Sequence, residues 1–130
     1  MKKRSLSLLV WLAAMLLFPT HNAVAESDGK ISHVVLVWLK ESGNQQIRHE
    51  FVQASQQLNG LPGVVNRHVG VVVPSDRVIV DDTFDVAITV TLENKKALQA
   101  YIQHPKHKKI LEQQLKPLVN RVVAYDFMSE

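Results

Sequence analysis

Large apolar residues occupy every second position in a stretch near residue 90, a period of two that is typical of a β-strand with one face turned to a core. One side of this stretch carries Val86, Ile88, Val90 and Leu92, and the other carries Ala87, Thr89 and Thr91. Three further stretches are rich in β-branched or aromatic residues and are bounded by turn residues. The sequence therefore predicts four strands, at residues 32–40, 64–73, 85–93 and 119–127.

Helical spacing appears in two places between these strands. Intervals of three and four residues predict one helical face, made of Ile47, Phe51, Ala54 and Leu58. Asn44 is the expected N-cap of this helix, and Asn94 the expected N-cap of a second helix that runs to about residue 102. Pro105 is expected in the first turn of a third helix, and this helix must end before Pro117.

The predicted order is β-α-β-β-α-(α)-β, an α+β chain whose short connections fold into a four-stranded antiparallel sheet with the helices on one face. Both faces of the first strand are apolar, however. One face carries Val35, Val37 and Leu39, and the other carries Val34, Leu36 and Trp38. Because the helices can cover only one face, we expect a second copy of the chain to cover the other, as a symmetric homodimer.

The beginning of the chain has the character of a cleavable signal peptide. Lys2, Lys3 and Arg4 precede an apolar run that is too short to span a bilayer, and small residues precede a cleavage point after Ala25. We therefore assign residues 1–25 to a signal peptide, 26–30 to a polar leader and 31–127 to one domain. The mature protein would be periplasmic or secreted, with no membrane attachment after cleavage.

Cleavage also changes the charge of the protein. It removes three of the 15 basic residues and none of the 12 acidic residues, so the mature chain carries no net formal charge. A nucleic-acid partner is therefore not expected. The chain has no cysteine, so the domain must be stabilised by its core without disulfides.

The stretch Ala97–Ile110, with the sequence ALQAYIQHPKHKKI, carries the candidate chemistry. His107 falls in the first turn of the helix that Pro105 opens, where the helix terminus disfavours a positive charge and so lowers the pKa of the imidazole. A neutral histidine suits a general base, although a packing role for His107 is equally open. His104 directly precedes the proline and is expected to cap the helix.

Two further residues accompany His107 as candidates. His33 begins the first strand and should lie beside Asp126 of the last strand, which would orient its ring. Tyr101 shares a helix face with Leu98, and its hydroxyl could reach a cavity. A structural hydrogen bond is the alternative role of His33, and core packing that of Tyr101. The histidines lack the spacing of a zinc motif, so neither a metal nor another cofactor is expected.

The sequence resembles the stress-responsive A/B barrel (Dabb) family, whose ferredoxin-like units dimerise into an α/β barrel. The resemblance rests on HVVLVWLK, LPGV, DVAITVTLE, LQAYIQHPKH and LVNRVVAYDF, in the family's order. Plant polyketide cyclases similar to olivetolic acid cyclase use a histidine base with a tyrosine and an opening-strand histidine beside it. Position by position, the resemblance implies His107 as the base, with Tyr101 and His33 beside it.

Two classes of function stay open. The first is a non-catalytic stress or ligand-binding module that takes a small apolar or carbonyl-containing molecule, and the sequence favours this class because no unambiguous catalytic set is present. The second is a cofactor-free cyclase or lyase that uses a histidine base. A wide cavity lined by Val35, Val37 and Phe51 would favour the enzyme, whereas a filled interior would favour the module.

The leader makes a prediction about the exported protein. Intact-mass spectrometry should find Glu26 as the first residue, because small residues precede it at the positions that signal peptidase reads. A mature mass that still includes residues 1–25 would contradict the assignment.

Overall fold

The computed structural model describes residues 29–130. The signal peptide assigned to residues 1–25 and most of the polar leader lie outside the described residues. Among the residues that are described, no helix has the length and apolar character needed to cross a membrane.

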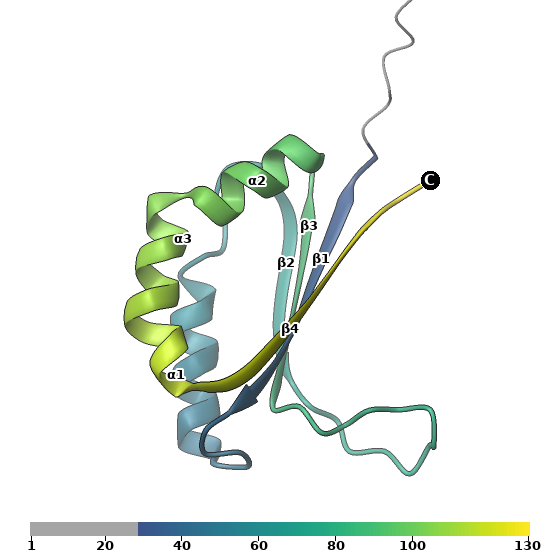
Figure 1. The fold of residues 1–130 in the computed structure, drawn as a ribbon, viewed down its shortest axis with the longest axis vertical. Helices are drawn as coiled ribbons and strands as arrows, with labels where there is room; N and C mark the ends of the chain where they lie inside the picture. The colour runs from purple at the N-terminus through teal and green to yellow at the C-terminus, as the bar shows by residue number, and fades with distance from the viewer. Residues whose placement is uncertain (1–28) are drawn as a thin grey trace, which may run out of the picture.

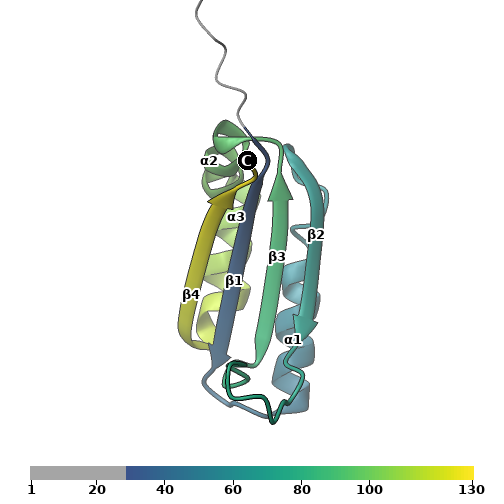
Figure 2. The ribbon, with the colours of Figure 1, turned by 90° about the vertical axis from the view of Figure 1, so that its right-hand side faces the viewer.

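Four antiparallel strands form one sheet in the order β2-β3-β1-β4. All the helices lie on one face of this sheet (Figure 1), and the opposite face is open to the viewer in Figure 2. The strands are β1 (Ile31–Leu39), β2 (Val64–Val71), β3 (Val86–Leu92) and β4 (Val119–Met128), and the helices are α1 (Gln45–Gln56), α2 (Lys95–Gln103) and α3 (Pro105–Ile110). The predicted α+β architecture is confirmed, with β2 ending two residues earlier than expected.

The core lies between the helices and one face of the sheet. Val86, Val90 and Leu92 of β3 are at most 1% exposed, as their alternation predicts, and Phe51 of α1 packs into the same core. Burial of a side chain of this size stabilises the fold by about 1.5 to 3 kcal/mol. The same face of β1 carries Val35 and Val37, so the other side of β1 points away from the helices.

A buried carboxylate fixes the connection from β1 to α1. Asp85, which precedes β3, accepts hydrogen bonds from Leu39 N at 2.8 Å and from Ser42 Oγ and Gly43 N at 2.9 Å. Burial raises the pKa of the Asp85 carboxyl, but the three hydrogen bonds outweigh burial, and the pKa lies below its ordinary value of 3.8. The chain then enters α1, where the Asn44 side chain accepts from Gln46 N and Ile47 N as the predicted N-cap.

The helices that follow β3 meet at a capped break. Asn94 caps α2, and His104 caps α3 by accepting the Lys106 N–H on Nδ1 at 3.1 Å, so both predicted caps are confirmed. Beyond α3 the chain continues as a π-helical turn, Leu111–Leu115, and a 3-10 turn, Lys116–Leu118. Figure 1 shows α2 at one end of the sheet and α3 beside α1. The helix was expected to end before Pro117, and the chain changes to a 3-10 turn at Lys116.

A long connection between β2 and β3, residues 72–84, has no strand or helix and is called the arm below. Figure 1 shows the arm extending past the sheet on the side away from the helices. Trp38 Nε1 anchors its base by donating to Thr83 Oγ1 at 3.0 Å, while Val78 and Ile79 are 101% and 85% exposed. The arm therefore presents apolar side chains beside the open face of the sheet.

Candidate functional site

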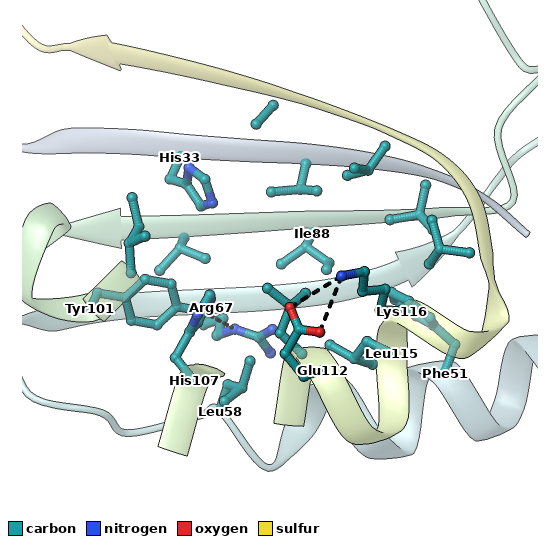
Figure 3. A pocket seen from close by; sticks show the side chains of 18 residues that line it. His33, Phe51, Leu58, Arg67, Ile88, Tyr101, His107, Glu112, Leu115 and Lys116 are labelled. Atoms are coloured by element: carbon teal, nitrogen blue, oxygen red, sulfur yellow. Dashed lines mark hydrogen bonds and ion pairs between the residues drawn. The ribbon is translucent and has the colours of Figure 1, made fainter. Parts of the chain in front are cut away.

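A cavity of 480 Å³ lies between the sheet and the helices. Its walls come from all four strands, from α1, α2 and α3, and from the π-helical turn (Figure 3). The three residues predicted to line a pocket, Val35, Val37 and Phe51, all do so. The lining is mainly apolar, so its few polar side chains determine what chemistry the cavity can support.

The three predicted site residues, His33, Tyr101 and His107, all line this cavity. The Tyr101 ring has edge contacts with both histidines, with ring centroids 4.7 Å apart for His107 and 6.3 Å apart for His33. Tyr101 is only 2% exposed, which confirms that it belongs to the core as well. The arrangement brings together residues that are 74 positions apart in the sequence, from β1, α2 and α3 (Figure 3).

His33 has the carboxylate partner that the sequence predicted. Asp126 lies directly opposite it on β4, and His33 Nδ1 is 2.5 Å from Asp126 Oδ1. This contact fixes the orientation of the imidazole ring, and His33 forms part of the cavity wall. The contact is compatible with both predicted roles of His33, a structural hydrogen bond and a part in a reaction, and both stay predictions.

The pKa of His107 is held below its ordinary value of 6.5. Burial is the largest cause, and repulsion from His33, Arg67 and His104 adds to it, while the carbonyl of Ile102 opposes the shift. The predicted direction is confirmed, but burial accounts for it without an appeal to the terminus of a six-residue helix. His107 Nδ1 is buried and has no hydrogen-bond partner among the described residues. A buried nitrogen of this kind is commonly satisfied by a ligand or water.

Arg67 lines the cavity as well, and it was missed in the sequence analysis. It projects from β2 to the helix side and donates to Ser55 Oγ at 2.6 Å, Asn59 Oδ1 at 3.0 Å and Tyr101 Oη at 3.3 Å. The available signal was its place in the alternation of β2, because Arg67 continues the row of Val69 and Val71 on the side that faces the core. A charged residue on the core face of a strand is unusual, whereas a charged residue on the exposed face is ordinary. The position of Arg67 in this row was therefore a signal of a special role.

A family model for the Stress Responsive A/B Barrel Domain matches residues 31–129. The chain belongs to the Dabb family. The match extends over all the strands and helices described above, and the resemblance noted from the sequence is thereby confirmed. No curated protein matches this Dabb domain.

Solved structures of proteins from several organisms share the Dabb domain's fold. A Dabb family protein with a ferredoxin-like fold from Mesorhizobium loti has 18% identity and a TM-score of 0.65, covering 78% of this chain and 98% of the other. A dimeric ferredoxin-like protein of unknown function from Thermobifida fusca has 21% identity and a TM-score of 0.63, with coverages of 78% and 92%. A hydroxynitrile lyase from Passiflora edulis has 15% identity and a TM-score of 0.64, with coverages of 79% and 95%. At these identities the likeness establishes the ferredoxin-like fold.

The two histidines of the HPKH segment should behave differently. In an NMR titration, the His107 imidazole should titrate below 6.5. The unfolded chain then binds the proton more readily, so the free energy of unfolding should fall as the pH decreases from about 6.5 towards the lowered pKa. His107→Gln should remove this part of the pH dependence.

His104→Ala is the matched control for that titration. It should lower stability by about 0.5 to 2 kcal/mol, as the loss of an N-cap does, while the titration of His107 stays below 6.5. An ordinary, exposed titration curve for His107 would contradict the buried environment described here.

Proposed function

We propose that this Dabb domain binds a small, mainly apolar, carbonyl-containing molecule in its cavity and carries out cofactor-free proton transfer on it. The observation that carries the proposal is a 480 Å³ cavity in which Tyr101 and His107 lie side by side. A filled interior would have favoured a structural module, whereas this volume is in the range of small-molecule sites. Ligand binding is common to both classes of function, and the neutral His107 favours the enzyme.

The hydrogen bonds of Tyr101 suit it to polarise a carbonyl group. Arg67 Nε donates to the Tyr101 oxygen, so the phenolic proton is free to be donated to a ligand oxygen. Neutral His107 can then take a proton from the carbon next to that carbonyl. The C–H bond breaks, its electron pair moves into an enolate, and the proton resides on the imidazole. Attack of the enolate carbon on a second carbonyl of the same molecule forms a C–C bond, and the new alkoxide takes up the proton.

The Passiflora protein supports an enzymatic role in a limited way. It is named a hydroxynitrile lyase and has this fold, so the fold accommodates an enzyme as well as proteins of unknown function. Fold alone does not transfer an activity. The proposal therefore rests on the side chains of this chain's own cavity, and the lyase shows only that the fold is compatible with catalysis.

The open face of the sheet supports a homodimer as the functional form. Val34, Leu36 and Trp38 lie on this face of β1 by strand alternation, and Tyr125 and Phe127 of β4 are 57% and 58% exposed. The Thermobifida protein and one from Bacteroides fragilis are described as dimeric. Here, a second copy packed face to face would cover the apolar surface, with each arm extending beside the partner.

Export completes the proposal. The basic, apolar and small-residue segments of residues 1–25 support secretion, so the dimer would act in the periplasm or outside the cell. A role in stress is an expectation that comes from the family's name.

A simple ketone can test the proton-transfer chemistry. The wild-type protein should bind 4-phenyl-2-butanone and accelerate deuterium incorporation next to its carbonyl in D₂O, followed by NMR. His107→Gln should retain binding but lower the exchange rate by about 100-fold or more, because a general base contributes this much. His104→Ala should exchange at the wild-type rate. If the ketone binds but its deuterium exchange is not accelerated, the proposed enzymatic function is contradicted and a ligand-binding function remains.

Sedimentation can test the dimer separately. The wild-type protein should sediment as a dimer at micromolar concentration, and Leu36→Glu should convert it to a monomer, because an unpaired charge in the interface costs several kcal/mol. Gln53→Glu places the same charge on an exposed position of α1 and should leave the dimer intact. A monomeric wild-type protein would refute the face-to-face arrangement.

A further inference from the structure

Arg67 brings a positive charge to the cavity without a matching negative charge. Its three hydrogen-bond partners are neutral oxygens, those of Ser55, Asn59 and Tyr101. The ion pairs formed within residues 29–130 are His33 with Asp126 and Lys116 with Glu112, so no carboxylate of this part of the chain pairs with Arg67. A charge held against apolar surface is costly unless it is paired.

The guanidinium group also has hydrogen-bonding capacity to spare. It carries five N–H donors in a planar fork, and three of them are used by partners in residues 29–130. Figure 3 shows the group between Tyr101 and Glu112, at the wall of the cavity. Two donors therefore have no partner in residues 29–130, and a planar fork matches the geometry of a carboxylate.

The other charged groups of the cavity do not compensate Arg67. Glu112 of the π-helical turn and Lys116 of the 3-10 turn pair with each other at 3.1 Å, and both line the cavity. His107 adds no charge near pH 7, because burial lowers its pKa. Among the arginine, lysine and glutamate residues that line the cavity, Arg67 is therefore the one without an oppositely charged partner in residues 29–130.

Anchoring of α1 is the structural role that Arg67 also performs. Ser55 lies in the last turn of α1 and Asn59 just beyond it, where a positive charge complements the helix dipole. Ser55 is fully buried, so this contact holds the guanidinium in place. The contacts with Ser55 and Asn59 use two of the guanidinium donors. They do not explain why Arg67 also lines an apolar cavity.

We propose that the cavity selects an anionic ligand, a molecule with an apolar body and a carboxylate that binds to Arg67. The carboxylate would accept the unused donors of the fork, and the apolar body would contact the sheet residues Val35 and Ile88 and the helix residue Phe51, all of which line the cavity. The inference rests on the proposed function, since it requires that the cavity bind a small molecule. It adds the charge class of that molecule and assigns a specificity-determining role to Arg67.

Two isosteric probes separate charge recognition from simple binding. Isothermal titration calorimetry with the full mature protein should show that 2-naphthoate binds about tenfold to a hundredfold more tightly than neutral 2-naphthamide, the range expected for hydrogen bonds to a charged group. Arg67→Gln should remove this preference and leave the affinity for the amide unchanged. Lys96→Gln is the matched control, because it removes one positive charge from an exposed position of α2 that does not line the cavity, and it should keep the preference.

The outcomes distinguish this inference from the proposed function. If both probes bind equally to the wild-type protein, or if Arg67→Gln retains the preference, the anionic assignment is overturned while ligand binding stands. If neither probe binds, both proposals fail. Should Arg67→Gln not fold, Arg67→Lys keeps the charge but loses the planar fork, and a preference reduced to below tenfold would support the assignment. A preference unchanged in Arg67→Lys would overturn the bidentate contact.

Discussion

The break between α2 and α3 is the constraint on which the site depends. Pro105 has no N–H to continue α2 and fits the first turn of a new helix, so the proline determines the break. His104 adds stability by accepting the Lys106 N–H. The chain changes direction at this point (Figure 1). Tyr101, before the break, and His107, after it, consequently meet with ring centroids 4.7 Å apart at the cavity wall.

Both faces of the sheet carry apolar side chains, and the two faces differ in what covers them. On the helix side, the alternating residues of β3 are buried. Two of them, Ile88 and Val90, line the 480 Å³ cavity that lies between the sheet and the π-helical turn after α3. On the other side the face is left to a partner copy in the proposed dimer. In the two proposals, one side of the sheet thus holds a ligand and the other side holds a partner copy.

The polar side chains of the cavity form a connected set. Arg67 is held by α1 and touches Tyr101, Tyr101 contacts both histidines, and His33 is oriented by Asp126 from β4. Each member comes from a different strand or helix, so the packing of the whole domain sets their distances. In such a set a donor, a neutral base and a fixed cation can act on one small molecule, which is the basis of both proposals.

The sequence by itself determined the strands and the helix caps, because alternation, proline and capping residues act over a few positions. It also predicted the pairing of His33 with Asp126, because the expected topology places the first and last strands side by side. It also identified His107, Tyr101 and the apolar residues of the pocket, through the resemblance and the face each occupies. Only the tertiary structure decided that Arg67 joins them, since its partners Ser55 and Tyr101 lie on separate helices. The cavity volume and the cause of the lowered His107 pKa were likewise decided by packing, because both depend on how closely helices approach the sheet.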